Sequence, residues 1–261
     1  MIWCVIVLGL VQGLTEFLPV SSSGHLVLLN KFFGINNDFL LLSVILHLAT
    51  LFSVVLVLRK EILEVVKKPF GSVGRKLILA SVPTIIIVLL FKGIIDKAFE
   101  GAFLPICFML TAVLIVVSEC ISKSKQKNCV DAEKTLNEEI TNKTAIIMGI
   151  SQGLAVFPAI SRSGSTICAG LALKKDRKQV ARFSFLMSVP IIFASLIFEV
   201  YEYISSGQAL TLLWYELLIG FVVAFVSGFF AVKFMLKIVE KHSLIPFAVY
   251  LVVISFISFL V

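Results

Sequence analysis

The first thirty residues contain no lysine or arginine, and charged residues make up only 15% of the 261-residue chain. Hydrophobic residues make up 59% of it, and its mean hydropathy is +1.06. One soluble core of this length could not bury so much apolar surface. The composition therefore argues against a soluble domain and predicts an all-α polytopic membrane protein.

Two other absences narrow the possibilities. The five cysteines are scattered, odd in number and form no CxxC pair, which argues against both a disulfide framework and a zinc site. The apolar N-terminal stretch lacks a basic flank and a small-residue cleavage site, so we expect it to remain in the mature protein rather than act as a signal peptide.

Apolar runs of about 20 residues, long enough to cross the hydrocarbon as helices, occur six times. These predicted spans are residues 39–58, 77–95, 102–121, 183–204, 212–232 and 244–261. Two further apolar stretches, 1–33 and 144–173, are each broken near the middle by a polar patch with proline and glycine. Each is either a span or a re-entrant hairpin that enters and leaves by the same face.

The distribution of basic residues favours two hairpins. In that arrangement one set of connections holds Arg59, Lys60, Lys67, Lys68, Arg75, Lys76, Lys123, Lys125, Lys127, Lys134, Lys143, Lys174, Lys175, Arg177, Lys178, Arg182, Lys233, Lys237 and Lys241. The opposite set holds only Lys31, Lys92 and Lys97. The positive-inside rule then makes the crowded side cytoplasmic and places both termini outside. Because the net charge of +7 is a topology signal, we expect membrane lipids around the chain and no nucleic-acid partner.

Arg162 belongs to neither set of connections. It lies at the break of the second stretch, where the hairpin arrangement buries it in the membrane at a cost of about 2.5–3.5 kcal/mol. Such a residue needs a partner, and a bound anion would serve.

The residues around Arg162 repeat a sequence motif from the start of the chain. GLVQGLTEFLPVSSSG (Gly9–Gly24) and GISQGLAVFPAISRSG (Gly149–Gly164) align without a gap at an offset of 152 − 12 = 140 residues. A short apolar helix and three spans follow each copy, so the second half should lie inverted in the membrane. We therefore predict one membrane domain with repeat one at 1–122, a cytoplasmic linker at 123–143 and repeat two at 144–261. The polar breaks of such inverted repeats meet near the bilayer midplane.

The residues at each break suit an anion site. Pro19 and Pro158 favour ending a helix, whereas Ser21–Gly24 and Ser161–Gly164 supply caps for starting the next one. The N-terminus of a helix offers free N–H groups and partial positive charge to a phosphate.

Ionisable residues inside the membrane are functional candidates by default, which singles out Glu16 and His25. His47 lies in mid-span and either lines the pocket or forms a hydrogen bond in the core. Glu119 is expected to extend from its span toward the cytoplasmic face.

At these residues the sequence resembles the undecaprenyl pyrophosphate phosphatase family of the bacitracin-resistance type, over essentially its whole length. The first family motif reads here as Gln12, Glu16, Ser21, Ser22, Ser23, Gly24 and His25. The second, PGxSRSxxT, reads as residues 158–166. Gln12 replaces a glutamate found in many members. Ala159 replaces a glycine, so a turn there should avoid positive φ.

The resemblance implies hydrolysis of undecaprenyl pyrophosphate to the monophosphate, which recycles the lipid carrier of cell-wall synthesis and confers bacitracin resistance. It also implies a divalent cation, Mg²⁺ or Ca²⁺, and an active site open to the outer face of the bacterial cytoplasmic membrane. The predicted catalytic residues are Glu16, Ser22, His25 and Arg162. The predicted substrate-binding residues are Ser21, Ser23, Gly24, Ser161, Ser163, Gly164 and Thr166. Glu16 and Gln12 are the predicted metal ligands.

The residue types suggest catalytic roles but leave more than one mechanism and function open. Arg162 would grip phosphoryl oxygens, and Glu16 would hold the metal or act as a base. Ser22 would attack phosphorus, with His25 as its base or as the acid for the leaving group, or else a metal-held water would attack. A transporter of polyprenyl phosphate or another organic anion is the rival function, because inverted repeats are also transporter architecture. A scaffold protein would leave Arg162 and Glu16 unexplained.

The charge distribution yields a test of topology at Cys129, which lies among the lysines of the predicted cytoplasmic linker. With the other four cysteines replaced, an impermeant thiol reagent should label Cys129 only after the cells are opened. Labelling of intact cells would contradict the predicted orientation.

Overall fold

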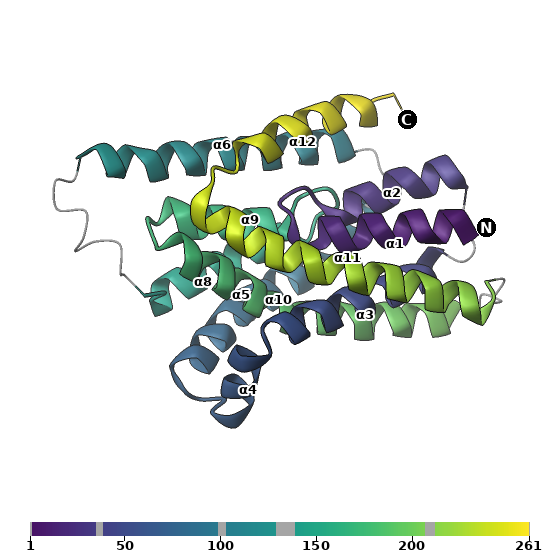
Figure 1. Ribbon diagram of the computed structural model, residues 1–261, viewed down its shortest axis with the longest axis horizontal. Helices are drawn as coiled ribbons and strands as arrows, with labels where there is room; N and C mark the ends of the chain where they lie inside the picture. The colour runs from purple at the N-terminus through teal and green to yellow at the C-terminus, as the bar shows by residue number, and fades with distance from the viewer. Residues whose placement is uncertain (1, 35–38, 99–102, 129–138, 207–211, 261) are drawn as a thin grey trace.

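The computed structural model describes residues 2–34, 39–98, 103–128, 139–206 and 212–260, and every regular element within these ranges is a helix (Figure 1). Five of the described helices are long and apolar enough to cross a membrane. They are α3 (Phe39–Val57), α5 (Ser72–Ala98), α6 (Leu104–Asn128), α10 (Arg177–Ser206) and α11 (Trp214–Lys241). The prediction of an all-helical polytopic membrane protein is confirmed.

The sixth predicted span, 244–261, is shorter than expected. It corresponds to α12 (Ile245–Ser258), whose 14 residues cover about 21 Å at 1.5 Å per residue. That length falls short of the roughly 30 Å hydrocarbon core, so six full-length spans are not confirmed. The helix lies along α6, where the Ser255 hydroxyl donates to the Pro105 carbonyl at 2.8 Å.

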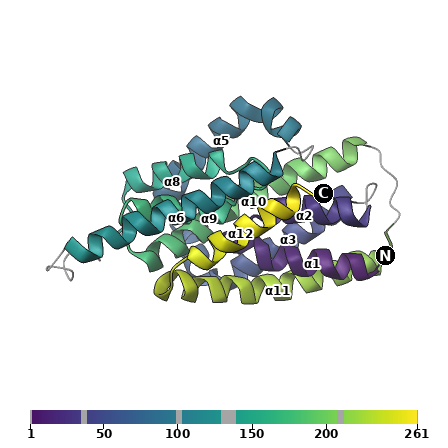
Figure 2. The same ribbon diagram turned by 90° about the horizontal axis from the view of Figure 1, so that it is seen from above.

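The two broken stretches fold as pairs of short helices, α1 (Ile2–Phe17) with α2 (Ser22–Phe33) and α8 (Asn142–Leu154) with α9 (Arg162–Ala172). Their lengths of 16, 12, 13 and 11 residues are all below that of a spanning helix. The pairs point inward from opposite ends of the helical body (Figures 1 and 2). Their turns touch, since the Ser163 hydroxyl donates to the Leu18 carbonyl at 2.9 Å.

Each hairpin packs on a long helix from the other half of the chain, α1 against α11 and α8 against α5. Glycine permits both contacts. A Cβ added at Gly13 would lie 2.5 Å from the Ala224 carbonyl oxygen, and one added at Gly149 would lie 2.1 Å from that of Ala80. Small residues of this kind let helix backbones approach closely in membranes. The halves are therefore interlocked rather than side by side.

The ends of the chain lie together. The start of α1 and the end of α12 occupy one end of the helical body, and the end of α6 and the start of α8 occupy the other (Figures 1 and 2). Helix α6 extends to Asn128, into the predicted linker, while Cys129 is outside the described residues.

The basic connection after α3 contains a helix that the sequence analysis does not anticipate, α4 (Arg59–Lys67). Its nine residues include no fully buried side chain. Glu61 of this helix accepts a hydrogen bond from Arg182 of α10 at 2.6 Å. The contact is solvent-exposed and joins α4 to the start of α10 by an ion pair.

The expectation that Glu119 extends to the membrane face is wrong. Its side chain is 1% exposed and pairs with Arg177 of α10 at 2.7 Å. It also accepts the backbone N–H of Leu244 at 2.9 Å. Arg177 in turn donates to the carbonyls of Val239 and His242. The partly exposed Arg177 stabilises the buried charge of Glu119, so Glu119 ties α6 to α10 and to the α11–α12 connection.

Candidate active site

Serine caps begin the second helix of each hairpin, as the sequence predicts. Ser21 accepts the Gly24 N–H at 3.4 Å, and Ser161 accepts the Gly164 N–H at 3.1 Å. These bonds satisfy N–H groups that have no partner within their own helix. Both helix starts therefore lie at the junction of the two hairpins, where their partial positive charge favours an anion.

Glu16 lies at the centre of this junction, near the end of α1. Its side chain is 1% exposed, and one of its oxygens, Oε2, accepts hydrogen bonds from Ser22 at 2.6 Å and from the Gln12 amide at 2.9 Å. Its other oxygen, Oε1, accepts Arg162 Nη2. A buried carboxylate needs such partners, because unpaired burial of a charge is costly.

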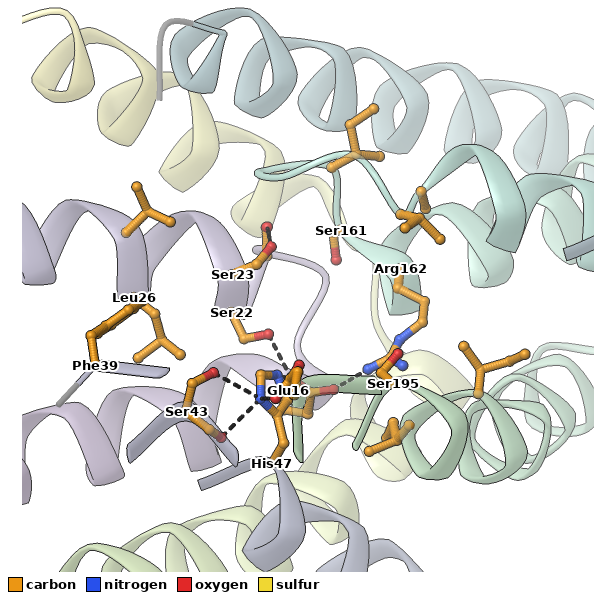
Figure 3. Close-up of a pocket in the computed structure, with 18 residues that line it drawn as sticks. Glu16, Ser22, Ser23, Leu26, Phe39, Ser43, His47, Ser161, Arg162 and Ser195 are labelled. Carbon is orange, nitrogen blue, oxygen red and sulfur yellow. Dashed lines mark hydrogen bonds and ion pairs between the residues drawn. The ribbon is translucent and has the colours of Figure 1, made fainter. Parts of the chain in front are cut away.

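Arg162 joins the two hairpins. It is the first residue of α9, and its guanidinium reaches across to Glu16 of α1. Its side chain remains 21% exposed and faces a cavity of about 210 Å³ (Figure 3). Because guanidinium has five N–H donors, Arg162 can hold Glu16 and a phosphate at once.

Six of the predicted residues line this cavity: Glu16, Ser21, Ser22, Ser23, Ser161 and Arg162. Leu26, Val27 and Phe39 form an apolar part of its wall, with Leu26 and Phe39 on the side away from Arg162 (Figure 3). The cavity therefore combines a polar centre with an apolar wall.

Four polar residues of the cavity were not predicted as site residues: Ser43 and His47 of α3, and Ser195 and Glu199 of α10. The sequence analysis left His47 open between a pocket and a core position, and the structure places it in the pocket. Glu199 falls inside a predicted span, so the rule that singled out Glu16 could also have found it.

His25 lies away from the position expected of a base for Ser22. Its Nδ1 is 2.7 Å from the Ser21 carbonyl and its Nε2 is 2.7 Å from the Tyr250 hydroxyl. Its ring stacks on that of Tyr250, and His25 is not part of the cavity lining. These contacts suit a residue that fixes α2 against α12 better than a base.

The other predicted binding residues have structural partners. Thr166 donates within its own helix and shares a 2.6 Å hydrogen bond with Ser184. Ser163 bonds to the first hairpin turn, as described above. Gly24 and Gly164 lie where an added Cβ would meet Phe108 at 2.5 Å and Ser161 at 3.0 Å, respectively. These four positions shape the junction, and Gly24 and Gly164 offer backbone N–H groups already used by the caps.

Glu16 and Gln12, as they stand, do not form a cation site. Both carboxylate oxygens of Glu16 accept hydrogen bonds, and Gln12 turns its amide nitrogen toward them. Within the described residues, no three histidine, cysteine or acidic side chains converge on one point. The divalent cation stays a prediction, and no step below depends on it.

The backbone at Ala159 corrects a second expectation. Ala159 has φ of 64°, in the left-handed region that the sequence analysis excluded for this turn. The residue is fully buried, close to Gly24 of the facing hairpin. Packing across the junction therefore outweighs the local strain of a side chain at positive φ.

Comparison with known proteins shows which family the sequence belongs to. A family model described as bacitracin resistance protein BacA matches residues 5–257. The chain belongs to the BacA family.

Three relatives named undecaprenyl-diphosphatase show how much of this BacA-family chain is shared. One, from Carboxydothermus hydrogenoformans, is 42% identical over 247 residues, which cover 94% of this chain and 91% of the relative. One from Halothermothrix orenii is 38% identical over 253 residues, covering 95% and 93%. One from Sulfurihydrogenibium is 33% identical over 259 residues, covering 98% and 97%.

The geometry predicts that Arg162→Lys weakens anion binding although the charge is kept. One ammonium group cannot reproduce the planar fork that serves Glu16 and a phosphate together. By calorimetry in detergent, the affinity for inorganic pyrophosphate should fall on the order of tenfold or more. Arg182→Lys, on the exposed pair with Glu61, is the matched control and should bind like the wild type. Equal affinities of wild type and Arg162→Lys would mean that Arg162 serves Glu16 alone.

Proposed function

We propose that this BacA-family protein hydrolyses undecaprenyl pyrophosphate to undecaprenyl phosphate and inorganic phosphate. This recycles the lipid carrier of cell-wall synthesis and confers bacitracin resistance. The names of its relatives support the activity, which their full-length similarity extends to this chain. The observation that carries the proposal is the Ser22–Glu16–Arg162 cluster, which joins a nucleophile, a base and a phosphate-binding group in one cavity.

Phosphoryl transfer depends mainly on positioning and on cationic or N–H groups around the phosphate. Arg162 supplies the cation, and the start of α9 supplies the dipole. The apolar wall at Leu26, Val27 and Phe39 suits the first isoprene units of the lipid. The two sides of the cavity therefore match the two parts of the substrate.

The hydrogen bond from Ser22 to Glu16 favours serine as the nucleophile. Ser22 Oγ would form a bond to the terminal phosphorus while its proton passes to Glu16 Oε2, 2.6 Å away. The anhydride P–O bond breaks, and undecaprenyl phosphate leaves with the electron pair. Water then attacks the phosphoserine. Of the two candidate bases, Glu16 and His25, this step uses Glu16.

The packing supports the inverted repeat. Hairpin α1–α2 rests on α11 from the second half, and hairpin α8–α9 rests on α5 from the first half. Each hairpin thus makes the same kind of contact with the opposite half of the chain, as expected for a repeat. The serine caps and the buried glutamines Gln12 and Gln152 also recur at the 140-residue offset.

The position of the cavity supports an active site open to the outer face. Positive charge places Arg59 and Arg177 on the cytoplasmic side, so the start of α3 and the end of α10 lie outside. Phe39 and Ser43 of α3, together with Glu199 of α10, therefore line the cavity from the outer halves of their helices. Both chain termini fall on the same side, which agrees with the arrangement in Figure 1.

A divalent cation would be held mainly by the phosphates of the substrate, because Glu16 and Gln12 form no preformed site for it. Mg²⁺ is commonly bound through substrate phosphates and few protein ligands. When bound, it would neutralise phosphoryl charge.

Serine attack predicts that Ser22→Ala lowers turnover at least ~10³-fold, about 4 kcal/mol of barrier, while substrate binding changes little. Phosphate release from undecaprenyl pyrophosphate by purified protein in detergent measures this. Ser205→Ala, on the exposed end of α10, is the control and should match the wild type.

Brief incubation with substrate labelled in the terminal phosphate should also leave label on Ser22. If Ser22→Ala keeps a tenth or more of the turnover and no label is trapped, a water molecule attacks directly. If the wild type releases no phosphate, the proposed activity itself is wrong.

A further inference from the structure

The cavity contains a second group of ionisable residues that the serine mechanism above does not use. His47 of α3 lies between two carboxylates. Its Nε2 is 3.9 Å from Glu16 Oε2, and its Nδ1 is 3.6 Å from Glu199 Oε2. Four helices thus bring Ser22, Glu16, His47 and Glu199 into one row along the cavity wall, with Ser22 and Glu199 at its ends.

A contact within its own helix determines the tautomer of His47. Nδ1 is 3.0 Å from the Ser43 carbonyl oxygen, which can only accept, so Nδ1 carries the hydrogen in the neutral ring. The Ser43 hydroxyl, 3.2 Å away, and Glu199 lie on the same side of the ring. The lone pair of Nε2 therefore faces Glu16 and the cavity.

Glu199 is the second carboxylate beside His47, and its side chain is 22% exposed. Its Oε2 is buried and has no hydrogen-bond partner among the described residues, and His47 is the cation-forming group next to it. A carboxylate held beside an imidazole stabilises the positive charge that the ring gains on protonation. Protonation of His47 at Nε2 supplies that charge between Glu16 and Glu199.

We propose that His47 accepts from Glu16 the proton that Glu16 removes from Ser22, and that Glu199 orients His47 and stabilises its charge. The proposal rests on the phosphatase activity proposed above. Both residues act through Glu16, so they are positioning residues rather than groups that touch the phosphate. Glu16 would be returned to its ionised state while the phosphoserine exists.

The protons balance over the two chemical steps. In the first, Ser22 Oγ bonds to phosphorus, the anhydride P–O bond breaks, and the serine proton moves through Glu16 to His47 Nε2. In the second, water bonds to phosphorus and the Ser22 Oγ–P bond breaks. One water proton passes through Glu16 to Ser22, the other stays on the inorganic phosphate, and His47 releases its proton to solvent.

The distance between His47 and Glu16 is consistent with proton transfer after Glu16 has taken the proton of Ser22. At 3.9 Å, Nε2 and Oε2 are too far apart for a hydrogen bond, and a shift of about 1 Å would bring them within range. Arg162 holds the other oxygen of Glu16, so the carboxylate keeps its place while its proton is transferred.

The test is a double-mutant cycle on phosphate release from undecaprenyl pyrophosphate. His47→Gln should lower kcat about 100-fold with KM within about twofold, because general acid–base groups contribute about 10²- to 10⁴-fold. Glu199→Gln should lower kcat by a smaller factor. In the His47→Gln background the second substitution should have no further effect, since Glu199 acts only through His47.

Glu202→Gln, an exposed carboxylate one turn further along α10, is the matched control and should keep wild-type kcat. Thermal unfolding of each variant separates loss of fold from loss of turnover. Added imidazole should partly restore His47→Ala, which a purely structural role would not produce.

Three results would overturn the proposal while the wild type remains active: unchanged kcat in His47→Gln, a rise in KM alone, or independent effects of the two substitutions. An inactive wild type would instead refute the phosphatase activity on which the proposal rests.

Discussion

The ion pair between Glu16 and Arg162 is the interaction on which the arrangement of this membrane protein depends. Each charge alone would be costly at the depth where the hairpin turns lie. Because one comes from α1 and the other from α9, their pairing holds the two hairpins together. The same pair leaves Arg162 facing the cavity, so the contact that stabilises the junction also prepares it for an anion.

The need to bury these charged turns also constrains the surrounding helices. Hairpins too short to span the membrane must bury their polar turns in protein, because the hydrocarbon offers no hydrogen-bond partners. Close glycine contacts let α1 and α8 rest on α11 and α5, which surround the turns. The resulting pocket is polar where the turns meet and has apolar residues, including Leu26, Val27 and Phe39, in its wall. It therefore suits a charged head group on a lipid chain.

The sequence predicts the parts of this design that depend on composition and local chemistry. Apolar runs, lysine positions and the repeated motif indicate the spans, the hairpins and the central place of Glu16 and Arg162. The serine caps follow from local rules and are confirmed.

Side-chain direction and long-range pairing are what the sequence does not predict. Nothing local shows that His25 turns to Tyr250, or that Arg177, 58 residues away, pairs with Glu119. His47 and Glu199 come together only through the packing of α3 on α10. The positive φ of Ala159 likewise reflects contact with the facing hairpin rather than a preference of alanine.

Glu16 and Arg162 compensate each other's charge across the two hairpins, and a thermal unfolding cycle in detergent measures this compensation. Glu16→Gln and Arg162→Gln each leave one charge uncompensated, whereas the double variant removes both. The double variant should therefore unfold at a higher temperature than either single variant. A double variant that loses the sum of the two single losses would contradict it.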